Sequence, residues 1–225
     1  MTEILRLDNV SLSLPSRAGT VDILKTVSFI AQAGEAIGIV GPSGSGKTSM
    51  LMVASGLEAA SSGKVEACGF SFDKQGEQAL ARFRRDNVGI VFQSFHLIPT
   101  MTALENVSVP LEFRGRADAA EQAADALRKV GLGHRLTHYP SQLSGGEQQR
   151  VAIARAIAAG AKLLLADEPT GNLDQETGAA VIELLFEMKE KTGATLLLVT
   201  HDRSLAQRCD RILEVRDGHV SEGHL

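Results

Sequence analysis

The amino-acid sequence predicts an α/β protein with a mainly parallel sheet, because short apolar runs alternate with runs of helical pattern. The runs that we interpret as buried strands lie at 37–40, 162–166 and 195–200. The helical patterns lie at 50–57, 151–159 and 181–189. Strands joined by helices usually pair in parallel, so these runs favour a parallel sheet covered by helices.

The stretch from about residue 95 to residue 160 interrupts this alternation. It contains an alanine-rich helical pattern at 117–130, followed by a glycine-punctuated stretch that reaches Ser141. We therefore expect a helical subdomain inserted into one domain that spans residues 1–225. No internal repeat, low-complexity tract or long linker in the sequence argues for two independent domains.

Composition narrows the function classes. A chain of 225 residues with 44% hydrophobic content can bury a sizeable core, and its net charge of -4 gives no attraction for nucleic acid. Cys68 and Cys209 lack the spacing of a zinc site or a disulfide framework. The N-terminal residues lack the apolar run of a secretory signal, and the apolar runs are shorter than the ~20 residues of a membrane span. We expect a cytoplasmic chain whose membrane role, if any, depends on a partner.

A glycine-rich motif between the first predicted strand and helix predicts a phosphate site. It matches the pattern GxxxxGK[ST] and consists of Gly41, Pro42, Ser43, Gly44, Ser45, Gly46, Lys47 and Thr48. Its glycines let the backbone turn its N–H groups inward, and the following helix adds the positive end of its dipole. We expect Lys47 to reach the outer phosphates and the Thr48 hydroxyl to bind Mg²⁺.

Two carboxylates end the apolar run at 163–166. Ligands of open α/β sheets gather at such strand ends. Asp167 would hold the magnesium through water, and Glu168 would accept a proton from the water that attacks the γ-phosphate. Taken alone, the two acids with Pro169 could equally form a polar turn, and the phosphate motif favours the catalytic interpretation.

A third motif, at residues 143–150, begins the next helical run. Ser144, Gly145 and Gly146 at a helix N-terminus form a second anion site. One nucleotide does not need two separate anion sites from the same chain, so we expect a second copy to supply one of them.

At these residues the sequence resembles the ATP-binding cassette family, whose signature is LSGGQ. Glu147 stands here in place of the final Gln. The resemblance spans essentially the whole chain. It implies a P-loop NTPase core of the RecA-like type, an N-terminal antiparallel β-subdomain, the inserted helical subdomain, ATP and Mg²⁺.

The same resemblance assigns further site residues. Gln93 is implied to contact magnesium or water, and His201, directly after a strand, to contact the γ-phosphate. Asp174, at the end of the segment 171–174, is implied to lie at the dimer interface. Leu14 stands where family members usually stack an aromatic ring on adenine, which predicts a weaker preference for adenine over guanine nucleotides. By themselves, a lone Gln and a lone His would carry no such role.

The family resemblance also implies partners. Two copies are expected to close around two ATP molecules and to drive an integral membrane permease from the cytoplasmic face of the inner membrane. Segments 92–99, 104–107 and 169–174 resemble the lipoprotein-release and macrolide-export branch, which handles lipid, lipoprotein or other hydrophobic cargo. The apolar segment 95–104 would receive the permease, or would instead pack inside the helical subdomain.

Other classes fit the sequence less well. A cassette ATPase of DNA repair or translation usually carries insertions, tandem cassettes or basic surfaces, and a GTPase would carry a guanine motif. A regulatory subunit without activity would be expected to lack Glu168 or His201, and both are present. A soluble ATPase of the same family, not coupled to transport, remains the alternative.

Overall fold

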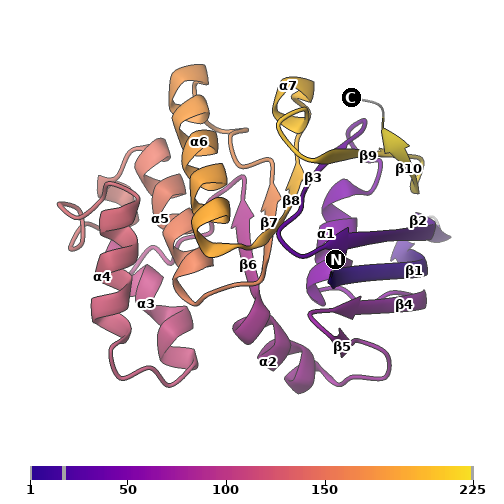
Figure 1. Ribbon diagram of the computed structural model, residues 1–225, viewed down its shortest axis with the longest axis horizontal. Coiled ribbons are helices and arrows are strands. Elements are labelled where there is room, and N and C mark those ends of the chain that lie inside the picture. The colour runs from indigo at the N-terminus through magenta and orange to yellow at the C-terminus, as the bar shows by residue number, and fades with distance from the viewer. Residues whose placement is uncertain (1, 17–18, 224–225) are drawn as a thin grey trace. The chain divides into compact units, whose positions relative to one another are not determined.

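The computed structural model describes residues 2–16 and 19–223, which fold into two compact units. Unit 1 is formed by Met1–Arg84 with Ala194–Leu225, and unit 2 by Arg85–Gly193 (Figure 1). Helix α2 (Glu77–Asn87) contains the boundary between the two along the chain. The grouping of residues 1–225 into one nucleotide-binding domain stays a prediction.

Unit 1 contains an antiparallel sheet with the strand order β2-β1-β4-β5. Buried Leu5 and Leu7 alternate with exposed Arg6 and Asp8 along β1, which is the pattern of a strand with one covered face. The N-terminal antiparallel subdomain implied by the resemblance is therefore confirmed. Its strands are β1 (Glu3–Ser16), β2 (Gly19–Gln32), β4 (Ser62–Ala67) and β5 (Phe70–Ser71).

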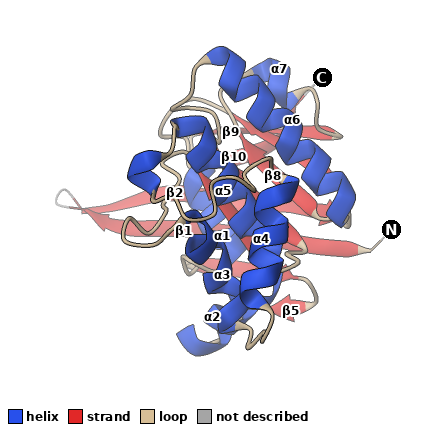
Figure 2. Ribbon diagram, turned by 90° about the vertical axis from the view of Figure 1, so that its left-hand side faces the viewer, coloured by secondary structure: helices blue, strands red, loops and turns tan. Residues whose placement is uncertain are grey.

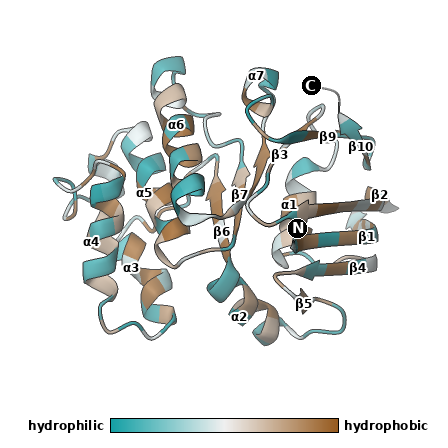
Figure 3. Ribbon diagram, in the orientation of Figure 1, coloured by the Kyte–Doolittle hydropathy of each residue, from teal (hydrophilic) through white to brown (hydrophobic). Residues whose placement is uncertain are grey.

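The second sheet of unit 1 is mainly parallel. Strand β3 pairs in parallel with β8 and with β9, and β10 pairs antiparallel with β9. Every residue of β3 and β8 is buried, as expected for strands covered on both faces, and β3 is hydrophobic along its length (Figure 3). The elements are β3 (Ala36–Val40), β8 (Thr195–Val199), β9 (Arg211–Arg216), β10 (His219–Gly223), α1 (Lys47–Ser55) and α7 (Arg203–Ala206).

Unit 2 combines a parallel strand pair with most of the helices of the chain. Helices α3, α4 and α5 pack around a core that includes Val107, Leu111, Leu127 and Val151 (Figure 2). The predicted insertion, residues 95–160, contains these three helices. The elements of the unit are β6 (Val88–Phe92), α3 (Ala103–Phe113), α4 (Ala119–Lys129), η1 (Pro140–Gln142), α5 (Gly145–Ala158), β7 (Leu163–Asp167) and α6 (Gln175–Thr192).

Two helices are longer than their apolar patterns predict. Helix α5 begins six residues before the predicted start at residue 151, because Ser144 caps it with its side chain. Helix α6 exceeds the predicted range 181–189 at both ends. It begins after the cap Asp174 and ends at Gly193, whose φ of 66° terminates the helix.

No helix within residues 2–16 and 19–223 combines the length and the apolar character needed to cross a membrane. Cys68 is half-buried and Cys209 is buried, and neither forms a disulfide.

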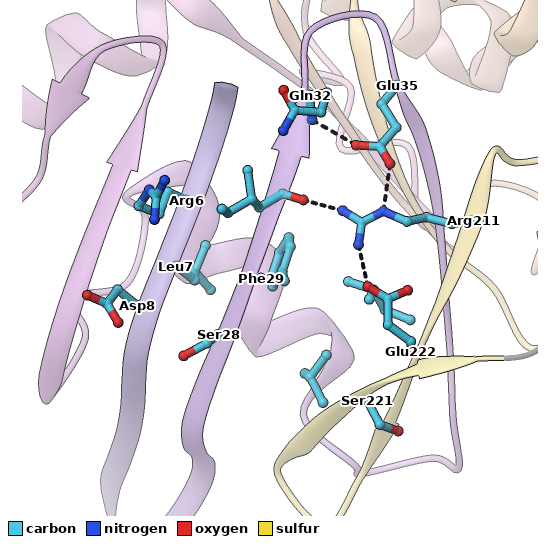
Figure 4. Close-up of a pocket in the computed structure, with 13 residues that line it drawn as sticks. Arg6, Leu7, Asp8, Ser28, Phe29, Gln32, Glu35, Arg211, Ser221 and Glu222 are labelled. Carbon is cyan, nitrogen blue, oxygen red and sulfur yellow. Dashed lines mark hydrogen bonds and ion pairs between the residues drawn. The ribbon is translucent and has the colours of Figure 1, made fainter. Parts of the chain in front are cut away.

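An arginine network ties the two sheets of unit 1 together. Residues of β1, β2, β9 and β10 line a hollow of about 540 Å³, and Arg211 lies in its wall (Figure 4). The guanidinium donates to Glu35 Oε1 at 2.6 Å, to Glu222 Oε1 at 2.6 Å and to the carbonyl of Ile30. Burial lowers the pKa of Arg211, but the two carboxylates raise it and the net shift is upward. These hydrogen bonds therefore fix the positions of the Arg211, Glu35 and Glu222 side chains relative to one another.

We expect Arg211→Met to lower the free energy of unfolding by about 1–3 kcal/mol, because it removes three hydrogen bonds and leaves the partly buried Glu35 carboxylate without its cation. Urea unfolding measures the change. Arg216→Met is the matched control, since Arg216 pairs with Glu214 at an exposed position and should change stability by less than about 0.5 kcal/mol. Equal effects of the two substitutions would contradict the role of Arg211.

Candidate functional site

The predicted phosphate motif forms the loop between β3 and α1 in unit 1. Gly41 has a φ of 151°, and a Cβ at this position would lie 2.1 Å from the carbonyl oxygen of Val215. Gly46 is the N-cap of α1, with a φ of 105°. A side chain fits neither position, so the loop keeps its tight path only with glycine there.

The start of α1 differs from those of α3, α4, α5 and α6 because it has neither a side-chain cap nor an acidic residue in its first turn. Helix α4 also lacks a side-chain cap, but it carries Glu121 in its first turn. Helices α3, α5 and α6 each receive a side-chain cap, from Thr102, Ser144 and Asp174. Helix α1 has no side-chain cap and no acidic residue in its first turn. Its N–H groups and helix dipole therefore suit an anionic ligand.

Two side chains add to this anion site. The ammonium of Lys47 donates to the carbonyls of Gly41 at 2.9 Å and Pro42 at 2.8 Å, which holds a positive charge inside the loop. Within the described residues, the buried hydroxyl oxygen of Ser45 has no hydrogen-bond partner. The loop thus offers a hydroxyl group, on Ser45, and a positive charge, on Lys47. Both are suited to bind a polyphosphate. Ser43 and Gly44 are exposed in the same loop, and Thr48 is exposed in the first turn of α1.

Two other predicted residues belong to unit 1. Leu14 lies in β1, is half-buried and pairs with Val21 of β2. His201 is exposed and follows Thr200, the first residue after β8. The neighbouring Asp202 caps α7, and its hydrogen bonds from Ser204 lower the pKa of this carboxyl.

Unit 2 brings Gln93, Asp167 and Glu168 together. Phe92 and Asp167 are direct partners in the parallel pair of β6 and β7, so Gln93 emerges beside the end of β7. Glu168 has a φ of 47°, a backbone conformation that non-glycine residues rarely adopt and that is enriched at functional sites. The carboxyl edge of this strand pair therefore carries one amide and two carboxylates.

The predicted signature forms the N-terminus of α5. The Ser144 hydroxyl oxygen accepts from the N–H of Glu147 at 3.2 Å, and the Glu147 carboxylate accepts from the N–H of Ser144 at 2.8 Å. This capping box uses the Ser144 oxygen as an acceptor and leaves its hydrogen for a ligand. A Cβ on Gly146 would lie 2.3 Å from Thr177 of α6, so the signature is packed closely against the neighbouring helix.

Charge partners fix the capping carboxylates. The backbone N–H of Ser144 and the guanidinium of Arg135, which donates to Glu147 at 2.8 Å, lower the pKa of Glu147. Asp174 accepts from the N–H of Thr177 at 3.0 Å, which lowers the pKa of this carboxyl as well. Arg135 thus places a positive charge beside the Glu147 carboxylate, at the position where the family signature has Gln.

The predicted magnesium ligands are the Thr48 hydroxyl, the Gln93 amide and the Asp167 carboxylate. All three offer oxygen, which Mg²⁺ prefers, and phosphate and water oxygens would complete its shell. The described residues hold no cluster of three or more His, Cys, Asp or Glu side chains suited to a metal ion. Oxygen donors of this kind suit Mg²⁺, and the binding of the ion by these three residues stays a prediction.

The sequence does not single out Asn172, Arg135 or Arg155, although all three contact predicted site residues or their neighbours. Arg135 lies 12 residues before its partner Glu147, and Arg155 lies 60 residues after Phe95. A pattern of neighbouring residues cannot predict hydrogen bonds between positions this far apart in the sequence. Asn172 could have been found from its place between Gly171 and Asp174.

Comparison with known proteins identifies the family. The profile of a family described as ABC transporter matches residues 24–171. The chain belongs to the ABC transporter family. As a member of this family it is an ATP-binding subunit with ATPase activity, and the P-loop α/β fold predicted from the sequence is confirmed.

Relatives within the ABC transporter family match nearly the whole chain. The uncharacterized ABC transporter ATP-binding protein YbbA of Escherichia coli K12 is 46% identical over 221 residues, which cover 97% of each chain. The lipoprotein-releasing system ATP-binding protein LolD of Geobacter metallireducens is also 46% identical, over 98% of this chain and 99% of its own length. The ATP-binding cassette MJ0796, solved as a post-hydrolysis dimer bound to ADP and Pi, matches with a TM-score of 0.91 and 39% identity over 99% of both chains.

Glu147 makes the signature helix sensitive to acid. Its folded pKa is lowered, so its contribution to stability is present above the pKa of the unfolded chain and is lost as the pH falls through the folded value. We expect the natural chain to be more stable than Glu147→Gln at neutral pH, and this difference to disappear as the pH falls below about 5. Urea unfolding at a series of pH values measures it. A difference that stays constant with pH would contradict the prediction.

Proposed function

We propose that two copies of this chain close around two ATP molecules with Mg²⁺ and drive an integral membrane permease. Each ATP would lie between the phosphate loop of one copy and Ser144, Gly145 and Gly146 of the other. The observation that carries this proposal is that small residues begin both α1 and α5. Helix α1 starts without a side-chain cap, and at the start of α5 the capping box uses the Ser144 oxygen only as an acceptor, so its hydrogen could be donated to a phosphate. The dimeric state of the related cassette MJ0796 supports it.

Some residues of the site would bind the nucleotide, and others would act in its hydrolysis. The loop from Gly41 to Thr48 would hold the phosphates, with Lys47 as the positive charge nearest the γ-phosphate. Leu14 would provide an aliphatic contact to the base. Asp174 would act at the interface between the copies. Thr48, Gln93 and Asp167 would hold Mg²⁺, which neutralises phosphate charge when it is bound.

Hydrolysis would depend on three further groups. Glu168 would accept a proton from the attacking water, and Gln93 would orient that water. His201 would contact the γ-phosphate. The Ser144 hydroxyl of the second copy, whose oxygen is already an acceptor in the capping box, would donate its hydrogen to the same phosphate. Loss of that phosphate would loosen the dimer, so hydrolysis would change the relative position of two rigid bodies.

Substituting Glu168→Gln should trap this dimer, because the phosphates still bind but no carboxylate accepts the proton from water. We expect light scattering to show that ATP doubles the monomer mass of 23.9 kDa. The double variant Lys47→Ala with Glu168→Gln is the control and should stay monomeric. A mass that ATP leaves unchanged in the single variant would refute closure around the nucleotide.

The permease would bind on unit 2, at the cytoplasmic face of the inner membrane. Within the predicted docking segment 95–104, Leu97 and Leu104 pack against the helical core, as the packing alternative requires. Ile98 is exposed, and Phe113 at the end of α3 is 70% exposed. Exposed apolar side chains are unfavourable in water and often mark a surface that a partner covers. We therefore propose that the permease contacts the turn around Ile98 and the exposed ring of Phe113.

The cargo would be a lipid, a lipoprotein or another hydrophobic molecule. The names of the LolD relatives, which are lipoprotein-releasing system proteins, support this class. A soluble ATPase without a permease is the alternative, and cross-linking in membranes separates the two.

We expect a photo-reactive residue in place of Ile98 or Phe113 to cross-link the chain to an integral membrane protein in cells. Glu187 is the matched control, since it is an exposed residue of unit 2 that lies in α6, an element outside the proposed surface. It should give about tenfold less product. Cross-linking at all three positions alike, or at none of them, would refute the proposed docking surface.

A further inference from the structure

The segment that carries Gln93 contains two strained residues in succession. Phe95 has a φ of 59° and His96 has a φ of 47°, both in the left-handed region. Residues other than glycine seldom adopt this conformation, and two in a row persist only where their surroundings hold them. The conformation of the Gln93 segment, which we define as residues 92–96, therefore depends on contacts from outside the segment.

Arg155 of α5 provides two such contacts. Its guanidinium donates from Nη1 to the carbonyl of His96 at 2.6 Å and from Nη2 to the carbonyl of Phe95 at 2.9 Å. The two strained residues thus share one planar cation, and the fork of a guanidinium suits two adjacent acceptors. Burial lowers the pKa of Arg155, and these bonds offset part of the cost of burying its charge.

The same helix also contacts the other end of the segment. Gln149 is fully buried, and its Nε2 donates to the carbonyl of Phe92 at 3.4 Å. The N-cap of this helix is Ser144, 11 residues before Arg155. One rigid helix therefore carries Ser144 at its end and the contacts to the Gln93 segment along its side.

Gln93 is fixed from a second direction as well. Its Nε2 donates to Asn172 Oδ1 at 3.2 Å, and Asn172 Nδ2 donates back to the carbonyl of Gln93 at 3.0 Å. A Cβ on Gly171 would lie 2.5 Å from that Nε2, so the amide fits only beside glycine. With its own side chain held in this way, Gln93 moves only if the segment moves.

We propose that Arg155 is a positioning residue that couples Gln93 to Ser144, an inference that rests on the proposed function. In the dimer, Gln93 acts on the ATP bound by its own copy, and Ser144 acts on the ATP bound by the other. A shift of the Gln93 segment at one site would displace α5 and so move Ser144 at the second site. Arg155 thereby makes hydrolysis at the two sites cooperative.

The test is the conservative variant Arg155→Lys, which keeps the charge but cannot serve both carbonyls in the same geometry. We expect its kcat to fall about tenfold or more, and its Hill coefficient for ATP to fall towards one. The dissociation constant for ADP, which the phosphate loop of a single copy binds, should change less than about twofold.

A strain-relief variant makes the test specific. Glycine adopts a positive φ without strain, so His96→Gly should need the guanidinium less than the natural residue does. Added to Arg155→Lys, it should recover kcat by about threefold or more. A role of Arg155 in stability alone would give no such recovery.

Arg114→Lys is the matched control. Arg114 also donates to main-chain carbonyls of unit 2, those of Arg85, Asp86 and Ala159, but it does not contact the Gln93 segment. We expect thermal stability to fall as in Arg155→Lys, with kcat per folded protein unchanged. Natural kcat and Hill coefficient in Arg155→Lys, or an equal loss of kcat in Arg114→Lys, would overturn the coupling role. A natural chain that fails to hydrolyse ATP would instead overturn the proposed function.

Discussion

Backbone N–H groups that converge at a helix N-terminus determine where this chain can hold phosphate charge. A polyphosphate is strongly hydrated, and only converging donors can replace its water. The loop before α1 offers such donors because Gly41 and Gly46 adopt conformations that a side chain would prevent. The uncapped start of α1 and the buried Lys47 complete the anion site.

In the proposed function, helix α5 of unit 2 has the corresponding role at the ATP of the other copy. Its N-terminus is capped by Ser144, and its side carries Gln149 and Arg155 against the segment that contains Gln93. The capping box is strengthened by the pair between Arg135 and Glu147, so the substitution of Gln by Glu in the signature keeps the geometry. In the proposed dimer, a single element thus joins Ser144, which would bind the nucleotide of the other copy, to the segment of Gln93, which would respond to hydrolysis.

Local patterns predicted the phosphate loop, the strand that ends in Asp167 and the start of the signature, because each consists of neighbouring residues with one chemical purpose. The alternation of strands and helices predicted the parallel pairs. Apolar periodicity placed the starts of α5 and α6 too late, since polar caps at Ser144 and Asp174 begin these helices. The antiparallel sheet came only from the family resemblance. The contacts of Arg211 and Arg155 join residues far apart in sequence, so they required the folded structure.

The central claim is that one triphosphate is bound jointly by two copies of the chain. A crystal structure of Glu168→Gln with ATP and Mg²⁺ tests it most directly. We expect the Ser144 hydroxyl of one copy to lie within about 3.2 Å of a γ-phosphate oxygen that Lys47 of the other copy also contacts. A structure in which Ser144 faces solvent in every pairing of copies, with ATP bound by Lys47 alone, would contradict it.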